Sequence, residues 1–271
     1  MALPAIPGME AAGVVESVGP DVTEFAVGDR VAYASGPLGA YAEVRLMPAN
    51  RVVKIPEGIS DCQAAAMMLQ GLTVQYLVRR TYPVKSGDTI LVHAAAGGVG
   101  LMLCQWAKYL GATVIGTVST AEKAALAQAH GCDHTILYTQ EDFVQRVSTL
   151  TQGRKVQVVY DSVGKDTFMG SLDCLAPLGM LVLFGQSSGP VPPFDLGLLS
   201  AKGSLFVTRP TLATYTAERH DLVAAATELF DRVLQGHVRV EIQQRYPLRD
   251  AQQAHRDLEA RRTTGSTILT V

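Results

Sequence analysis

The sequence is short of the features that mark several classes of protein. Its 271 residues include only four cysteines, Cys62, Cys104, Cys132 and Cys174, and these are scattered along the chain. Such usage is typical of reduced thiols in the cytoplasm rather than of a disulfide framework. Charged residues make up 18%, and the formal net charge is −2 with no basic block. The composition therefore indicates neither nucleic-acid binding nor electrostatic binding to a membrane.

Uninterrupted membrane-spanning runs are lacking as well. Two uncharged stretches, residues 89–107 and 174–194, are broken, the first by glycines and the second by prolines. The N-terminus shows no basic region followed by an apolar core, so we expect no signal peptide. With 48% hydrophobic residues, the chain is expected to be globular, with one large or two ordinary domains.

The stretch 89–108 predicts a nucleotide phosphate site. An apolar, strand-like run leads into glycines, and a helical pattern follows until Gly111. Against the dinucleotide fingerprint G-x-G-x-x-G/A, the glycine positions fall on Ala95, Gly97 and Gly100, so that alanine replaces the first glycine. Gly97 lets the backbone approach a pyrophosphate, and Gly100 lets the helix pack against the strand. The pyrophosphate is expected on the N–H groups that open the helix.

The end of the following strand, residues 113–118, indicates which dinucleotide is bound. An NAD site usually has an acidic residue there, about 20 residues beyond the glycines. This chain instead has Ser119 and Thr120, with Lys123 one turn into the next helix. Hydroxyls and a cation are suited to a 2′-phosphate, which favours NADPH over NADH. The alternative is that Lys123 is a solvated helix residue and Ser119 or Thr120 an N-cap.

The rest of the chain predicts an α/β fold with a doubly wound parallel sheet. Alternating apolar residues predict strands at 13–18, 27–33, 39–44 and 50–55, part of a small barrel or sandwich, and a helical pattern covers 61–69 and 72–80. Beyond residue 131, strands at 134–138, 156–163, 180–185 and 204–209 alternate with helices at 141–150 and 166–175. A long helix at about 216–235 precedes a strand at 244–248, a helix at 250–261 and a strand at 266–271. This tail is expected to pack on the N-terminal elements.

Seven short motifs are spread over essentially the whole chain: residues 7–15 (PGMEAAGVV), 27–31 (VGDRV), 39–43 (GAYAE), 71–74 (GLTV), 93–100 (HAAAGGVG), 159–164 (VYDSVG) and 204–210 (SLFVTRP). By these motifs the chain resembles the zinc-independent quinone oxidoreductases of the medium-chain dehydrogenase/reductase superfamily, the branch that includes ζ-crystallin.

This resemblance implies a Rossmann domain at residues 71–236 and a partial, discontinuous GroES-like β-barrel domain at residues 1–70 and 237–271. It implies hydride transfer from NADPH to a quinone or a similar conjugated carbonyl compound, without a metal, and a homodimer formed through the strand near Ser204–Arg209. The residues that it implies at NADPH are Thr73, Gly97, Gly98, Val99, Gly100, Ser119, Lys123, Tyr138, Ser162, Phe184, Gly185, Gln186, Ser187, Val207, Thr208, Arg209 and Arg261.

The chain departs from the family pattern at its start. Family members begin with several strands before the segment that is residues 7–15 here, so the barrel domain is expected to be shortened. An alternative function is therefore an NADPH-binding protein with little or no turnover, and a second is an alkenal or enone double-bond reductase. Tyr41 is a candidate for the acceptor cleft or simply a half-buried strand aromatic. No essential acid is evident, and a proton from solvent suffices for a quinone.

Single motifs bear on metal binding and on ester hydrolysis. Zinc alcohol dehydrogenases have a histidine where this chain has Met9, so no catalytic zinc is expected. The His130, Cys132, Asp133 and His134 group is better explained as the end of a helix and the start of a strand. The sequence Gly185–Gly189 fits G-x-S-x-G, with Asp195 and then His220, His237 or His255 in the order of α/β-hydrolases. The prolines that follow predict an extended loop where a nucleophile elbow needs a helix.

Overall fold

The computed structural model describes residues 3–260 and 262–271. The contacts within the chain divide it into two compact units: Met1–Gln75 with Leu212–Val271, and Tyr76–Thr211. We call them the first and the second unit. The tail thus groups with the N-terminal residues, as expected. This division by contacts places residues 71–75 and 212–236 in the first unit, and the functional domain boundaries drawn from the sequence stay a prediction.

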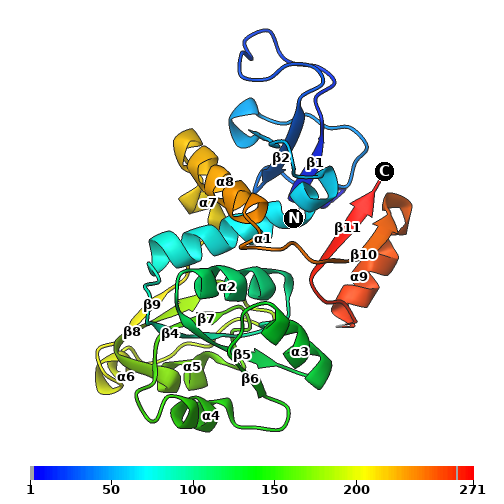
Figure 1. The fold of residues 1–271 in the computed structure, drawn as a ribbon. Helices are drawn as coiled ribbons and strands as arrows, with labels where there is room; N and C mark the ends of the chain where they lie inside the picture. Colours follow the sequence, from blue (N-terminus) through cyan, green and yellow to red (C-terminus); the bar gives the residue numbers. More distant parts are fainter. Residues whose placement is uncertain (1–2, 261) are drawn as a thin grey trace. The chain divides into compact units, whose positions relative to one another are not determined.

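The second unit is built on a parallel sheet with the order β6-β5-β4-β7-β8-β9 (Figure 1). Its strands are β4 (Thr89–Val92), β5 (Thr113–Val118), β6 (His134–Leu137), β7 (Val156–Asp161), β8 (Leu175–Leu183) and β9 (Phe206–Thr208). The strand order reverses beside β4, which pairs with β5 on one side and with β7 on the other. In such sheets ligands bind at the carboxyl ends of the strands near this reversal.

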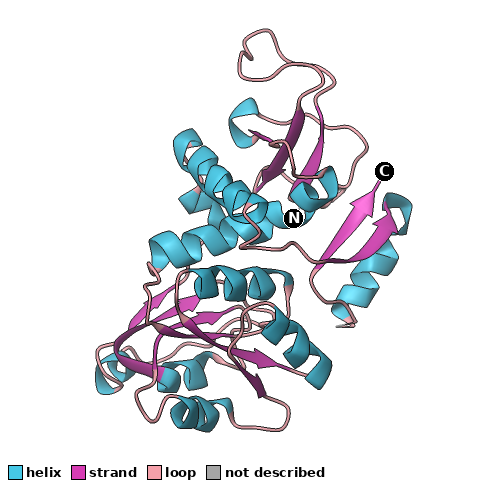
Figure 2. Cartoon of the chain, in the orientation of Figure 1, coloured by secondary structure: helices cyan, strands magenta, loops and turns pink. Residues whose placement is uncertain are grey.

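Helices cover both faces of this sheet, which makes it doubly wound (Figures 1 and 2). They are α2 (Gly98–Tyr109), α3 (Ala121–Ala129), α4 (Phe143–Leu150), α5 (Phe168–Cys174) and α6 (Gly197–Ala201). Leu91 and Val159 of the sheet pack with Val147 of α4 and Leu172 of α5, and all four side chains are fully buried. Trp106 of α2 is also fully buried. The apolar runs of the sequence form this core because strands covered on both faces bury every side chain.

The first unit contains two small sheets. One is antiparallel, with the order β1-β2-β3, and comprises β1 (Glu10–Val14), β2 (Arg30–Ala34) and β3 (Val53–Lys54). The other pairs β10 (Ile242–Pro247) with β11 (Ser266–Thr270) in parallel. The helices are α1 (Asp61–Tyr76), α7 (Leu212–Tyr215), α8 (Arg219–Leu234) and α9 (Ala251–Glu259), with short 3-10 helices at Ala49–Arg51 and Leu248–Asp250.

The structure differs from several sequence-based expectations. The strand predicted at 13–18 begins earlier and ends at Val14, and the strand predicted at 50–55 is reduced to Val53–Lys54 after a 3-10 helix. Residues 39–44, predicted as a strand, have no regular structure at 39–40 and form bends at 41–44. Gly39 has φ +127°, and only isolated hydrogen bonds join this segment to Pro7 and Gly8, such as Tyr41 N–H to the Pro7 carbonyl at 3.0 Å. The helical pattern predicted over 61–69 and 72–80 corresponds to one helix, α1, which continues into a π-helical turn at Leu77–Thr81.

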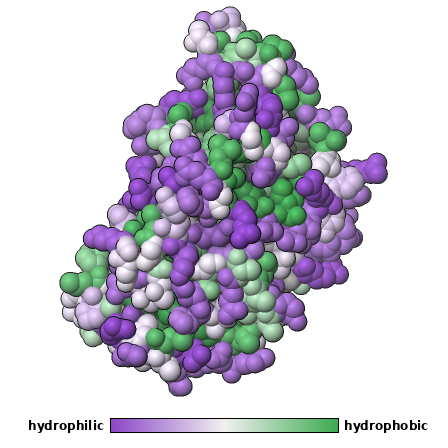
Figure 3. Space-filling view, viewed as in Figure 1, coloured by the Kyte–Doolittle hydropathy of each residue, from purple (hydrophilic) through white to green (hydrophobic). Residues whose placement is uncertain are grey.

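Among the described residues, no helix is long and apolar enough to cross a membrane. Figure 3 shows a face on which hydrophobic side chains lie in separate groups among hydrophilic ones. Exposed apolar atoms are common on protein surfaces.

Candidate functional site

The N-terminus of α2 has no side-chain cap. Gly97 is the N-cap residue and offers no side chain to the N–H groups of the first turn. Those N–H groups lack partners within a helix, and the helix dipole adds positive potential there. The loop before them is tight, with Ala94 at φ +53° and a hydrogen bond of 3.0 Å from Gly97 N to the Ala94 carbonyl. The position and chemistry are those expected for a bound phosphate.

The glycine-rich turn is packed too closely for larger residues at one position. A Cβ atom on Gly100 would lie 2.3 Å from the Ala94 carbonyl oxygen. Ala95, which replaces the first fingerprint glycine, is fully buried. Its methyl group is accommodated by Gly116 of β5, where an added Cβ would lie 2.6 Å from the Ala95 Cβ. A glycine on the neighbouring strand therefore compensates for the alanine in the fingerprint.

The end of β5 presents one cap and one cation. Thr120 is the N-cap of α3, and its hydroxyl accepts from Lys123 N at 3.3 Å. The capping alternative therefore holds for Thr120. Lys123 is half-buried, and its ammonium group forms no ion pair within residues 3–260 and 262–271. Ser119, also half-buried, precedes the cap. A cation without a carboxylate partner suits a phosphate beside this helix start.

The loops that follow β7 and β8 are joined to each other. The Asp161 carbonyl accepts from Phe184 N at 2.9 Å, and the Ser162 carbonyl accepts from Ser187 N at 3.1 Å. Ser188 N and its hydroxyl both donate to the Val163 carbonyl. A Cβ on Gly185 would lie 2.5 Å from the Ser162 carbonyl oxygen, so glycine is required there. The loop after β7 and the loop after β8, which both contain predicted cofactor residues, are thus held together by hydrogen bonds.

The remaining predicted residues lie in both units. In the second unit, Tyr138 follows β6 and is 45% exposed, Val207 and Thr208 lie in β9, and Arg209 follows it. In the first unit, Thr73 is buried in α1, and the Tyr41 hydroxyl lies 3.0 Å from His255 Nε2. Burial raises the pKa of Tyr41, and the charge of Glu10 adds to the effect. Arg261 lies outside the described residues. The roles of all these residues stay predictions.

A buried polar chain beneath these loops was not predicted from the sequence. His93, Thr117, Asp161 and Ser171 are each 2% exposed or less. His93 Nδ1 lies 3.0 Å from the Thr117 hydroxyl, and His93 Nε2 lies 3.0 Å from the Ser171 hydroxyl. Ser171 donates in turn to Asp161 Oδ2 at 3.2 Å. The available signal was a histidine and an aspartate at the ends of apolar strands, which gave no indication of their partners.

The histidine and cysteine group near residue 132 is engaged in ordinary structural contacts. His130 Nδ1 lies 2.8 Å from the Leu126 carbonyl oxygen. The Cys132 thiol donates to the His134 carbonyl, and Asp133 pairs with Lys108 at 2.5 Å. Within the described part of the chain, no three His, Cys, Asp or Glu side chains are grouped as metal ligands. Met9 is 43% exposed.

The hydrolase alternative lacks its local structure. Ser187 lies in a turn, residues 190–195 form no helix, and α6 begins only at Gly197. A nucleophile elbow requires a helix directly after the serine. The G-x-S-x-G match is therefore coincidental.

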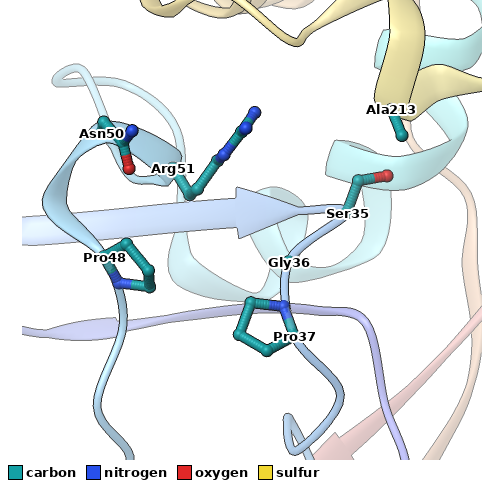
Figure 4. A pocket seen from close by; sticks show the side chains of 7 residues that line it. All are labelled: Ser35, Gly36, Pro37, Pro48, Asn50, Arg51 and Ala213. Atoms are coloured by element: carbon teal, nitrogen blue, oxygen red, sulfur yellow. The ribbon is translucent and has the colours of Figure 1, made fainter.

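The first unit contains a cavity of about 470 Å³ (Figure 4). It is lined by Ser35, Gly36, Pro37, Pro48, Asn50, Arg51 and Ala213. The Arg51 guanidinium donates to the Thr216 carbonyl at 2.8 Å, which ties it to the chain that follows α7. None of the predicted site residues lines this cavity.

Comparison with known proteins gives consistent matches. Residues 98–229 match the family described as zinc-binding dehydrogenase, and residues 1–57 match the alcohol dehydrogenase GroES-like domain. A quinone oxidoreductase of Pseudomonas aeruginosa is 58% identical over 98% of this chain and 82% of its own length. The crystal structure of Escherichia coli quinone oxidoreductase complexed with NADPH is 51% identical, covers 100% of this chain and 83% of its own, and has a TM-score of 0.97. A 2-haloacrylate reductase of a Burkholderia species is 48% identical over 98% of this chain and 81% of its own length.

Proposed function

The chain belongs to the quinone oxidoreductases, the ζ-crystallin-like branch of the medium-chain dehydrogenase/reductase superfamily, and we infer that it is an NADPH-dependent quinone reductase. The observation that carries the cofactor assignment is the uncapped N-terminus of α2 at Gly97. When bound there, NADPH would provide the hydride for the acceptor, with the proton drawn from solvent. The protein's part is to orient the two reactants.

The residues of the second unit fit a phosphorylated dinucleotide. We propose that the N–H groups of Gly98, Val99 and Gly100 hold the pyrophosphate. Gly97 lacks a side chain that would cover those groups, and the added Cβ on Gly100 would clash with the Ala94 carbonyl. Lys123, which has no ion-pair partner in the described part of the chain, would then bind the 2′-phosphate, with Ser119 beside it.

The other loop residues are assigned by their place at the carboxyl edge of the sheet. We propose that the joined loops containing Ser162 and Phe184–Ser187 hold the nicotinamide half, and that Tyr138 lies against the adenosine half. The remaining proposed contacts are Thr73, Val207, Thr208, Arg209 and Arg261, with Tyr41 in the acceptor cleft. We propose that the cofactor domain comprises residues 71–236 and that the GroES-like domain comprises residues 1–70 and 237–271.

The first experiment is a fluorescence titration with NADPH and with NADH, followed by 9,10-phenanthrenequinone in the same cuvette. We expect tighter binding of NADPH and its oxidation when the quinone is added. Lys123→Ala should weaken NADPH binding about tenfold and leave NADH binding nearly unchanged. Equal binding of both dinucleotides by the unmodified protein would contradict the role of Lys123. Binding without oxidation would favour a cofactor-binding protein without turnover.

A second candidate activity is reduction of an activated carbon–carbon double bond. It is supported by the 2-haloacrylate reductase among the relatives. The same cofactor site serves both reactions, so the acceptor decides between them. Steady-state rates with 2-chloroacrylate and with the quinone, at one NADPH concentration, separate the two. A higher kcat/KM for the acrylate would make the alkene reductase the main activity.

We further propose a homodimer formed through β9. This strand is the edge of the six-stranded sheet, and Phe206 on it is 54% exposed. An edge strand offers unpaired backbone groups to a second copy. Phe206→Lys places a charge on that edge and should give a monomer by light scattering. A monomeric unmodified protein would refute the proposal. We place the protein in the cytoplasm, which agrees with four free cysteines.

A further inference from the structure

The buried chain Thr117–His93–Ser171–Asp161 crosses the sheet directly beneath the loops assigned to NADPH. Its members come from the ends of β5, β4 and β7 and from α5, so it joins three neighbouring strands. The ring of Phe143 packs edge-on against His93, with ring centroids 5.1 Å apart, and closes one side. Because all four polar groups are buried, each needs a hydrogen-bond partner within the protein.

The partners fix the direction of every hydrogen bond in the chain. Asp161 Oδ2 accepts from the hydroxyl groups of Thr167 and Ser171, at 2.7 and 3.2 Å. The Ser171 proton is thereby used, so the Ser171 oxygen must accept from His93 Nε2–H. His93 Nδ1 then has no proton and accepts a hydrogen bond from the Thr117 hydroxyl. Burial lowers the pKa of His93, which agrees with a neutral ring in one tautomer.

One end of the chain shapes the loop after β7. Asp161 Oδ1 accepts from Val163 N at 2.7 Å and from Gly164 N at 3.0 Å, which folds residues 162–164 back over the strand. Gly164 has φ +93° in this turn. The loop after β8 is joined to these residues by backbone hydrogen bonds, as described above. A single carboxylate therefore sets the conformation of two loops.

The other end lies under the glycine-rich turn. His93 N donates to the Tyr160 carbonyl at 3.0 Å, and Ala95 N donates to the Thr117 carbonyl at 3.1 Å. His93 directly precedes Ala94, whose positive φ begins the turn that leads to Gly97. Displacement of the imidazole would shift the start of the phosphate-binding turn relative to β5 and β7.

We propose that Asp161 is a positioning residue for NADPH: through Ser171 it holds His93 in the Nε2–H tautomer and so fixes the three dinucleotide loops relative to one another. The proposal rests on the function inferred above. Asp161 is fully buried, so it is not expected to contact the cofactor or the acceptor directly. Its carboxylate orders the loops before the cofactor binds. The loops therefore lose less conformational entropy on binding.

Asp161→Asn tests the direction of these hydrogen bonds, because asparagine has almost the same shape as aspartate. The amide oxygen can still accept from Val163 N and Gly164 N, but the amide NH₂ now donates to Thr167 and Ser171. Ser171 must then donate to His93 Nε2, and His93 must carry its proton on Nδ1. The histidine tautomer is therefore expected to reverse. The ¹⁵N NMR signals of labelled histidine report this change, and the His93 signals are assigned by their loss in His93→Gln.

Two further variants separate an effect on loop position from a general loss of stability. Ser171→Ala removes the hydroxyl group that links His93 to Asp161 and so interrupts the series of hydrogen bonds. Thr151→Val removes a buried hydroxyl that donates to the Val147 carbonyl at 2.8 Å and accepts from Lys155 N at 3.0 Å. Thr151 lies in the same unit, before the amino end of β7, and is the matched control. We expect all three variants to lower Tm. Asp161→Asn and Ser171→Ala should weaken NADPH binding about tenfold, with kcat at saturating NADPH within about threefold of the unmodified protein, and Thr151→Val should leave binding unchanged.

The outcomes are distinguishable. An Nδ1–H tautomer in the unmodified protein, or unchanged NADPH affinity in both Asp161→Asn and Ser171→Ala, overturns the proposal. Equal loss of affinity in Thr151→Val overturns it too, since the effect then follows stability. If the unmodified protein fails to bind NADPH, the inferred function is wrong, whereas the tautomer measurement needs no cofactor. If Asp161→Asn does not fold, Ser171→Ala with its control still decides.

Discussion

Replacement of Glu10 by glutamine should stabilise the protein at alkaline pH. Glu10 begins β1, and its Oε2 accepts from Leu69 N in α1 at 2.8 Å. With the Gln70 amide oriented so that its nitrogen faces Glu10, that nitrogen lies 3.2 Å from Oε2. These hydrogen bonds favour the ionised form, but burial outweighs them and raises the pKa of Glu10 from 4.5 to about 7. The carboxylate is thus costly at neutral and alkaline pH.

The sign and size follow from linkage. Between pH 4.5 and 7 the folded protein holds a proton on Glu10 that the unfolded chain has released, so stability falls as pH rises and becomes level above pH 7. A rise of about 2.5 in pKa corresponds to about 3 kcal/mol. Glutamine has nearly the same shape and no charge, so Glu10→Gln should gain about 3 kcal/mol at pH 8 and less than about 1 kcal/mol at pH 5.

Urea unfolding of both proteins at pH 5, 6, 7 and 8 measures this difference. With an m-value of about 3 kcal/mol per molar, the midpoint at pH 8 should rise by about 1 M. Glu16→Gln is the control, because Glu16 is exposed and its substitution removes the same charge without burial. The reasoning fails if Glu10→Gln is less stable than the unmodified protein at pH 8, or if the two differ by the same amount at every pH.

Three other substitutions test separate contacts. Gly100→Ala places a Cβ 2.3 Å from the Ala94 carbonyl, so we expect a loss of about 1–3 kcal/mol in urea unfolding together with weaker NADPH binding; an unchanged midpoint would show that the turn can relax. Asp142→Ala removes the acceptor of two N–H groups at the start of α4 and should cost about 1 kcal/mol by thermal unfolding, with NADPH affinity unaffected. Tyr160→Phe removes a fully buried hydroxyl that donates to the Leu77 carbonyl at 3.2 Å, and a loss of about 1 kcal/mol is expected; a more stable variant would contradict this hydrogen bond.

The cofactor unit was predictable from the sequence because its signals are local. The strand expected at 113–118 is β5 with the same bounds, and the apolar helix after the glycines is α2. An apolar run followed by a turn residue identifies a buried strand without knowledge of its neighbours. The strand predicted at 39–44 failed because its alternating pattern has no regular partner strand, only isolated bonds to Pro7 and Gly8. The short helices α6 and α7 are below the length at which a pattern can be recognised.

The glycine-rich turn was predictable for the same reason, because Gly97 and Gly100 lie within a few residues of each other at the start of α2; its role at a phosphate stays a prediction. The buried chain joins His93 to Thr117 and to Ser171, which are 24 and 78 residues away, and no local pattern reports such pairing. Ala95 is similar: its compatibility with the turn depends on Gly116 across the sheet. The hydrogen bond from Leu69 N to Glu10, which partly offsets the effect of burial on the pKa of Glu10, likewise joins residues that are 59 positions apart.

The strand order of the second unit sets the sequence in which its parts form during synthesis. β4 and β5 are neighbours both along the chain and in the sheet, but β7 reaches its place beside β4 only after β6 and α4 have been made. At roughly 5–20 residues per second, ribosomal synthesis delivers Asp161 several seconds after His93. Until then the His93 imidazole has only Thr117 as a hydrogen-bond partner in this series, and His93 N lacks its hydrogen bond to the Tyr160 carbonyl of β7. Affinity for the dinucleotide is therefore acquired late, when β7 closes against β4, and a nascent chain that ends before Asp161 should not retain NADPH.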